Sequence, residues 1–214
     1  MVVGMARAST SASPSTRRTS PICSVSADAN PRILRFQRNS AQPRASEVRP
    51  TTIELRAIGK TYQLEYRPAH SRNIAVRSLP DQNRLLLLGA LQSDAAVAHA
   101  LRAWLTDVAR KELAVLLTEV ARAGGFHFAR VQARRQRTPW GSCSATGTIS
   151  LNVCLLFLEP AVVRYLLVHE LCHTRHMNHS HRFWSLVEAH EPDYKRLDRA
   201  LLHGWQNVPG WVFD

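Results

Sequence analysis

The sequence predicts an α+β fold in which N-terminal antiparallel strands precede a mixed core of helices and further strands. Three observations support this fold class. Apolar and polar residues alternate in residues 51–92, which is typical of strands. Apolar residues recur at helical spacing in residues 93–124, and again from Pro160 onwards. Between these two helices, residues 126–152 combine strand-like composition with turn residues.

The strand-rich part covers residues 51–92. Alternating apolar residues on either side of Gly59 predict a hairpin over residues 53–66. Residues 74–76 and 85–88 predict two more strands, because a polar turn segment separates two short apolar runs.

The remaining elements lie in residues 93–205, and a short tail follows them at residues 206–214. Residues 126–138 predict a strand, and residues 148–152 predict its partner. Pro160 begins the second long helix at the first helical position, which proline favours. Two shorter helices follow it.

Residues 1–50 differ from the rest of the chain in composition. They hold eight arginines, two acidic residues and many Ser, Thr and Pro, and they show no apolar period. We therefore expect a disordered basic extension. The first residues lack the apolar region of a secretory signal, but their acid-poor composition overlaps that of transit peptides, so a targeting role stays open.

The composition limits the classes of protein to consider. Lys and Arg number 28 and Asp and Glu 16, and the net charge of +12 makes nucleotides and nucleic acids candidate partners. The longest apolar run, residues 85–91, is far shorter than the ~20 residues that cross a bilayer, so we expect no membrane protein. The four cysteines form no C-x-x-C pair, and we interpret them as free thiols of a cytoplasmic protein.

The second long helix carries an H-E-x-x-H motif, from His169 to His173, which chance would place in such a composition only ~0.02 times. On a helix, His169 and His173 lie ~40° apart around the axis and one turn along it, so both rings can bind one metal ion. Glu170 lies ~100° from His169 and can accept a proton from water beside the ion. The motif predicts a zinc-dependent hydrolase with Glu170 as general base.

A catalytic zinc ion usually has three protein ligands, so a third is expected downstream of the motif. His176 would continue the same helix face, which rarely supplies three ligands to a tetrahedral ion. His179 is better placed, because Asn178 can end the helix and turn the chain back. His181, or an acidic residue in 188–191, is an alternative.

The spacing of His169, His173 and His179 also fits the metzincin pattern H-E-x-x-H-x-x-G-x-x-H. His176 occupies the position of the glycine that permits a tight turn. Met177, the only downstream Met, lies between the second and third histidines and cannot form a Met-turn. These two departures argue against a metzincin.

Several motifs in a fixed order give the sequence a resemblance to a known family. They are Trp140–Ser144, Gly147–Asn152, Val168–His173, Asn178–Ser180, Phe183–Trp184 and Pro192–Tyr194. With these motifs the chain resembles the YgjP-like metallopeptidase domain, the DUF45 family, which is related to the SprT-like and M48 zinc metallopeptidases. The resemblance covers roughly residues 50–205.

The resemblance implies a zincin-like catalytic core with one Zn²⁺ per chain. It implies His169, His173 and His179 as the metal ligands, Glu170 as the catalytic base, and packing of the W-G-S-C strand beside the active-site helix. We therefore expect residues 51–205 to form a metallopeptidase domain that hydrolyses peptide or protein substrates with zinc-activated water.

Four other side chains are candidates for the site. Tyr194 could donate a hydrogen bond to an oxyanion, or simply be a packed aromatic residue. His181 could orient a ligand or the substrate. Arg134 and Arg137 could bind anions, or lie on a solvated face of their strand.

Two other functions fit the sequence. Zinc chemistry combined with an arginine-rich strand would suit a hydrolase of nucleotide phosphoanhydrides. The SprT-like relatives suggest instead a protease associated with nucleic acid. A non-enzymatic binding module with structural zinc is less consistent with the sequence, because a structural site needs no base such as Glu170.

Overall fold

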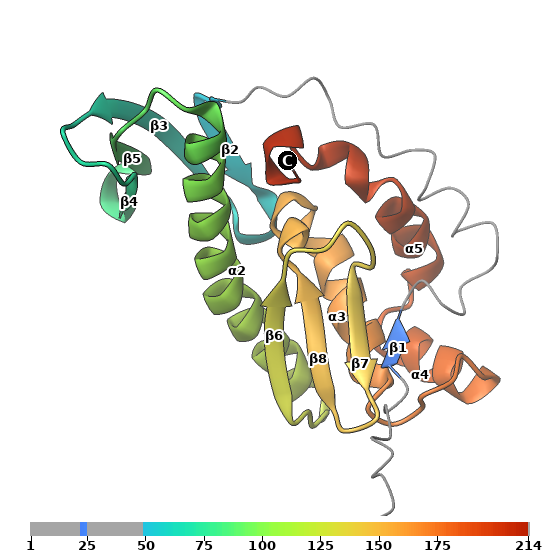
Figure 1. The fold of residues 1–214 in the computed structure, drawn as a ribbon. Helices are drawn as coiled ribbons and strands as arrows, with labels where there is room; N and C mark the ends of the chain where they lie inside the picture. The colour runs from blue at the N-terminus through green and yellow to red at the C-terminus, as the bar shows by residue number, and fades with distance from the viewer. Residues whose placement is uncertain (1–21, 25–48, 214) are drawn as a thin grey trace, which may run out of the picture.

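The computed structural model describes residues 22–24 and 49–213, which form a mixed α+β fold with two four-stranded sheets (Figure 1). The predicted disordered extension, residues 1–50, lies outside the described residues except for 22–24, 49 and 50. No helix in the described part is long and apolar enough to cross a membrane.

The first sheet has the strand order β2–β3–β5–β4. Its strands are β2 (Thr52–Leu55), β3 (Lys60–Pro68), β4 (Ala75–Leu79) and β5 (Arg84–Gly89). The pairs β2–β3 and β4–β5 are antiparallel, as the two predicted turns require. The central pair β3–β5 is parallel, so the expectation of antiparallel strands is wrong for this pair. The reason is burial: β5 is the most apolar strand, with Leu85 and Leu87 fully buried, and it takes the central position.

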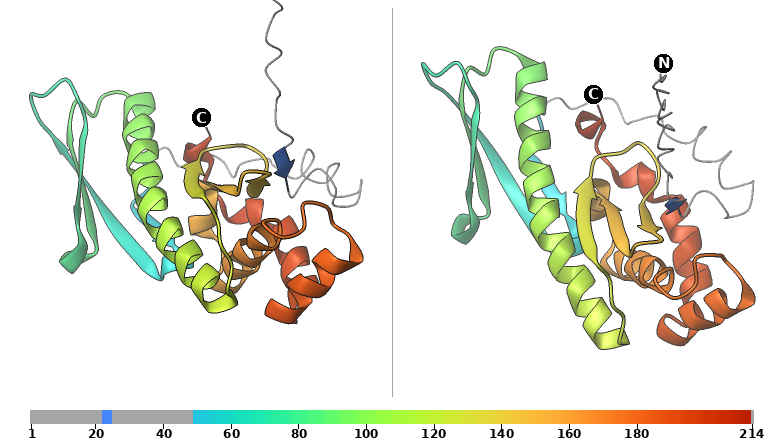
Figure 2. Two further views of the ribbon diagram at one scale, coloured as in Figure 1. Left: turned by 90° about the horizontal axis from the view of Figure 1, so that it is seen from below. Right: turned by 60° about the horizontal axis from the view of Figure 1, so that its bottom comes forward.

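Helix α2 (Asp94–Gly124) runs between the two sheets and contacts both (Figures 1 and 2). The Ser93 side chain caps it by accepting a hydrogen bond from the Ala96 N–H at 3.2 Å. Gly125 ends it in the left-handed conformation with φ 63°, which glycine adopts without steric strain. The sequence predicted both ends of this helix.

The second sheet has the strand order β1–β7–β8–β6. Its strands are β1 (Ile22–Ser24), β6 (Arg130–Arg134), β7 (Gly141–Ser144) and β8 (Thr148–Asn152). The predicted partners β6 and β8 pair in parallel. Strand β7 forms an antiparallel hairpin with β8, and β1 pairs antiparallel with the other edge of β7.

The helices of the second half pack against the second sheet and against each other. They are α3 (Pro160–Cys172), α4 (His181–His190) and α5 (Tyr194–Leu202), with 3-10 turns at Val153–Phe157, Gly204–Asn207 and Gly210–Val212. Pro160 stands in the first turn of α3, as predicted. Helix α3 contacts α2, α4, α5 and β7, which leaves it almost entirely buried.

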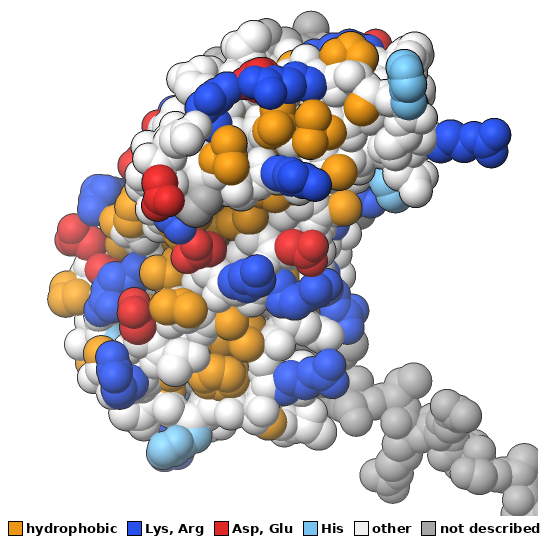
Figure 3. Space-filling model, turned by 90° about the vertical axis from the view of Figure 1, so that its left-hand side faces the viewer, with side chains coloured by type: hydrophobic (Ala, Val, Ile, Leu, Met, Phe, Trp, Pro, Cys, Tyr) orange, Lys and Arg blue, Asp and Glu red, His pale blue; other side chains and the backbone are white. Residues whose placement is uncertain are grey.

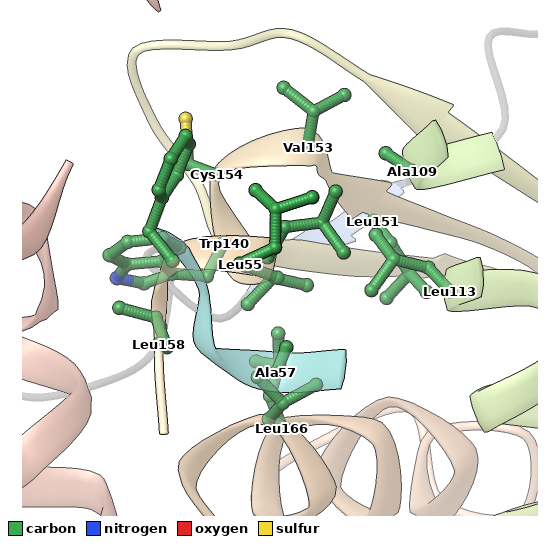
Figure 4. Close-up of a cluster of buried hydrophobic side chains, with 14 of the residues drawn as sticks. Leu55, Ala57, Ala109, Leu113, Trp140, Leu151, Val153, Cys154, Leu158 and Leu166 are labelled. Carbon is green, nitrogen blue, oxygen red and sulfur yellow. The ribbon is translucent and has the colours of Figure 1, made fainter. Parts of the chain in front are cut away.

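One hydrophobic core joins the two halves of the fold (Figure 4). Leu55 from the first sheet, Leu113 from α2, Leu151 from β8 and Leu166 from α3 all belong to it, and none is more than 1% exposed. The two sheets and the central helix therefore depend on each other for stability.

The C-terminal segment also belongs to this core. Val208, Trp211 and Val212 are buried, and the Arg102 guanidinium donates a hydrogen bond to the Trp211 carbonyl at 3.2 Å. The sequence reasoning separated residues 206–214 as a tail, but residues 206–213 pack on the domain. Trp211 and Val212 supply apolar surface that would otherwise face water.

Candidate metal centre

Helix α3 places a pair of polar side chains inside the core. His169 is 2% exposed and Glu170 is fully buried, although both stand among apolar residues of the helix. His173 directly follows the last residue of α3 and is also fully buried. Burying such groups is unfavourable unless a partner compensates for the lost water.

The loop between α3 and α4 brings a third histidine, His179, close to His169 and His173. The Nε2 atoms of His173 and His179 lie 3.2 Å and 3.1 Å from the Nε2 atom of His169. Among the described residues, these three histidines form the group whose ligand atoms could share one metal ion. Helix α3 ends at Cys172, so the chain turns back earlier than Asn178, where we expected the helix to end.

The protonation state of the rings suits metal binding. The His173 Nδ1 atom lies 3.0 Å from the His176 carbonyl oxygen, which can only accept, so Nδ1 carries the proton and Nε2 carries the lone pair. Burial lowers the pKa of His169 well below its ordinary value, and positive charge on His173 and His179 would lower it further. Neutral imidazole is the form that binds a metal.

The geometry fits a tetrahedral divalent ion. With zinc–nitrogen bonds of about 2.0–2.1 Å, two ligand nitrogens of a tetrahedral site lie about 3.3 Å apart. The separations of 3.1 and 3.2 Å from His169 are close to that value. The three histidines therefore fit a metal ion, and Glu170 lies outside this group of ligand atoms.

Glu170 is held in an apolar setting. Both of its carboxyl oxygens are buried and have no hydrogen-bond partner among the described residues. Burial raises the pKa of this carboxyl well above its ordinary value. Strand β7 lies against it: a Cβ atom added at Gly141 would stand 2.6 Å from Glu170 Oε1. Only glycine leaves room for the carboxyl at this point of the strand.

Aromatic side chains of α4 enclose the three histidines. The Phe183 ring centroid lies 4.9 Å, 4.5 Å and 4.7 Å from the ring centroids of His169, His173 and His179. Trp184 stacks on His179 with centroids 5.6 Å apart. These contacts fix the orientation of the imidazole rings and exclude water from one side of the cluster.

Comparison with known proteins identifies the family. The family model of the YgjP-like metallopeptidase domain matches residues 30–203. The chain belongs to this family. A solved structure, the metallopeptidase zymogen of Pyrococcus abyssi abylysin, is 28% identical to the chain, with a TM-score of 0.39. The match covers 44% of this chain and 95% of abylysin. No curated protein matches the chain.

Two of the predicted site residues of this YgjP-like domain lie outside the histidine cluster. His181 is exposed at the start of α4, with its Nδ1 atom 3.3 Å from Ser185 Oγ. Tyr194, at the start of α5, is half-buried and stacks on Trp184 at 5.4 Å. The Trp184 ring thus stacks on both Tyr194 and His179, whereas His181 faces solvent.

The predicted anion-binding arginines lie away from the three histidines. Arg134 is exposed and lines a polar pocket together with Thr148 and Ser150 of β8. These β8 residues alternate with the buried Ile149 and Leu151, so the pocket is on the sheet face opposite the core and α3. The Arg137 guanidinium instead lies 6.0 Å from the centroid of the Phe213 ring.

Sequence reasoning missed two features of the site. The contact of Gly141 with Glu170 has no local signal, although the W-G-S-C motif did place this strand beside the helix. A second feature is the hydrogen bond that Tyr165 Oη donates to Asp198 Oδ1 at 2.8 Å, next to His169. Burial raises the pKa of Asp198, and the Tyr165 bond and positive charge on His179 oppose that rise.

Proposed function

We propose that this YgjP-like domain is a zinc-dependent peptidase that hydrolyses peptide bonds with Glu170 as general base. The observation that carries the proposal is the convergence of three imidazole Nε2 atoms, together with the buried carboxyl of Glu170, the residue after His169, which has no hydrogen-bond partner among the described residues. Membership of a metallopeptidase family supports a peptide or protein substrate.

In this proposal His169, His173 and His179 hold one Zn²⁺. Zinc supplies Lewis-acid chemistry when bound, activating a water molecule and polarising a carbonyl group. The chain's own contribution is a set of neutral rings, fixed by Phe183 and by the His173–His176 hydrogen bond.

Glu170 would move the proton. Its carboxylate takes a proton from the attacking water as the water oxygen bonds to the scissile carbonyl carbon. It then returns that proton to the leaving amine nitrogen as the carbon–nitrogen bond breaks. Burial raises the pKa of this carboxyl, which brings it nearer the value of an efficient proton carrier at neutral pH.

Tyr194 remains our candidate donor to the oxyanion that forms on the carbonyl. It belongs to the aromatic stack that begins at His179 and passes through Trp184. Replacing Tyr194 by Phe keeps the stack and removes only the hydroxyl. We expect a lower kcat with zinc binding unchanged.

The experiment is metal analysis combined with an assay of fragment release from an unfolded protein. We expect one zinc per chain in the wild type and in Glu170→Gln, and little zinc in His179→Ala. We expect fragment release from the wild type and a loss of at least ~100-fold in Glu170→Gln. His127→Ala, which removes an exposed histidine, is the matched control. Full activity in Glu170→Gln would refute the mechanism.

The alternative functions receive no comparable support. Arg134 lies on the sheet face opposite the core, which does not favour a phosphoanhydride hydrolase. On the face formed by α2 and the first sheet, basic, acidic and hydrophobic side chains are interspersed, without a single-sign patch (Figure 3). Phosphate release from nucleoside triphosphates, or cleavage stimulated by DNA, would favour these alternatives.

A further inference from the structure

The outer edge of β7 begins beside the proposed catalytic base. Gly141, the first residue of β7, approaches Glu170 so closely that an added Cβ atom would contact the carboxyl at 2.6 Å. The inner edge of β7 is paired with β8. A chain paired along the whole outer edge would therefore reach Gly141, the residue that lies against the Glu170 carboxyl.

The occupant of this outer edge is the chain's own N-terminal segment. Strand β1 (Ile22–Ser24) lies antiparallel to β7, with Ile22 opposite Ser144 and Ser24 opposite Ser142 (Figure 1). In this register, the next position along an antiparallel partner faces Gly141. Strand β1 therefore runs from the Ser144 end of β7 towards its Gly141 end, where the strand lies against Glu170.

The edge suits recognition of a peptide main chain. An unpaired strand edge presents N–H and C=O groups that can add an extended peptide by strand pairing. The side chains of β7 are small: Gly, Ser, Cys and Ser in order. Such an edge binds through backbone hydrogen bonds and places few demands on the partner's side chains.

We propose that residues Ile22–Ser24 occupy the outer edge of β7 in competition with an extended peptide substrate. The proposal rests on the proposed peptidase function. A tethered segment competes at an effective concentration on the order of millimolar, so it reduces binding of dilute substrates without any covalent change. The full chain would then be a partly self-inhibited enzyme.

The first test uses hydrogen exchange in the full chain, because it needs no activity. Cys23→Pro removes a backbone N–H from the middle of β1 and disfavours pairing. We expect the amides of β7 to exchange at least ~10-fold faster in this variant. Ser9→Pro, outside β1, is the control and should leave the exchange of β7 unchanged. Equal exchange of β7 in the wild type and Cys23→Pro would overturn the proposal.

The second test adds a synthetic peptide of residues 19–28 to Cys23→Pro. We expect the peptide to restore slow exchange of β7, which shows that the variant is folded and that its edge is open. Failure of the peptide to protect β7 in a variant with faster exchange would overturn the assignment of β1 as the occupant.

The third test is kinetic and separates this proposal from the proposed function. With an unfolded protein as substrate, Cys23→Pro should lower KM several-fold at unchanged kcat, and the added peptide should inhibit it. An unchanged KM despite faster exchange would overturn the competition. Absence of cleavage by any form, with the exchange changes present, would refute the peptidase function and leave the docking of residues 22–24 standing.

Discussion

Gly141 shows how a single missing side chain can shape the site. The three atoms nearest to a Cβ built at this position all belong to Glu170, at 2.6, 3.0 and 3.0 Å. Its φ angle is not positive, so the glycine is not required by a turn. Close approach of the strand to the carboxyl is therefore the reason for glycine here.

Replacing Gly141 by Ala should displace the Glu170 carboxyl, because its side chain is the flexible partner in the clash. We expect kcat to fall by about 100-fold, since a displaced base transfers protons poorly. Zinc content should remain that of the wild type. Ser150→Ala, in the adjacent strand, removes only the hydrogen bond from Gln132 and serves as the control. An unchanged kcat in Gly141→Ala would contradict the assignment.

The raised pKa of Glu170 makes the stability of the metal-free chain depend on pH. The folded state keeps the carboxyl proton where the unfolded state, with its ordinary pKa of 4.5, has released it. The free energy of unfolding therefore falls as pH rises above 4.5, until pH passes the folded-state pKa.

Glu170→Gln has no such proton, so its stability relative to the wild type should increase with pH. The increase should reach up to about 1.4 kcal/mol per pH unit. Urea denaturation with a chelator present, from about pH 5 to about pH 8, measures this difference. His169 titrates in both proteins, so its contribution largely cancels. A difference that does not change with pH would be inconsistent with a buried carboxyl.

At the scale of elements, α4 supports the metal centre from one side. Phe183 is fully buried and its ring packs against all three histidine rings. The helix thus contacts all three of the proposed ligands, although it supplies none of them.

Phe183→Ala should reduce the free energy of unfolding by about 3–5 kcal/mol, because it leaves a cavity in the core. It should also weaken zinc binding, since the imidazole rings lose their packing partner. Urea denaturation and competition with a zinc chelator measure the two effects. Arg182→Ala, an exposed change in the same helix, should alter neither. Wild-type zinc affinity in Phe183→Ala would show that the ring does not position the ligands.

The sequence predicted where helices and strands lie better than it predicted how the strands pair. Helical spacing of apolar residues located α2, and Pro160 located the start of α3. The pairing of β6 with β8 was predicted, but the parallel direction of this pair and of β3–β5 had no such signal, because alternation of apolar residues specifies the buried face of a strand but not the direction of its partner.

The same distinction applies to the site. His169, Glu170 and His173 could be predicted because helical spacing alone relates them. The choice of His179 depended on how the chain turns after the helix, which the sequence does not specify. The family resemblance was the stronger reason for choosing it. The contacts of Gly141 and Phe183 with the site join segments that are distant in the sequence, so no local pattern revealed them.

At the scale of the whole molecule, the C-terminal segment completes the core. The Trp211 ring meets Phe157 edge to face with centroids 6.3 Å apart. The Arg135 guanidinium donates to the Val212 carbonyl at 3.4 Å. The last turn therefore joins the 3-10 segment before α3 to the loop after β6.

Trp211→Ala should reduce the free energy of unfolding by about 3–5 kcal/mol, because a large and almost fully buried side chain is lost. Gln206→Ala, an exposed change in the preceding turn, should have little effect. Thermal and urea denaturation of both variants check this expectation. Equal stability of Trp211→Ala and the wild type would mean that the segment contributes little to the core.

Two tryptophans connect this end of the chain to the second sheet. Trp140, just before β7, and Trp205, after α5, are stacked with centroids 3.9 Å apart and planes 21° from parallel. Indole rings this close couple electronically, so the pair should give its own near-ultraviolet circular dichroism band. That band would vanish once the C-terminus detached, which provides a label-free optical reporter of an intact enzyme core.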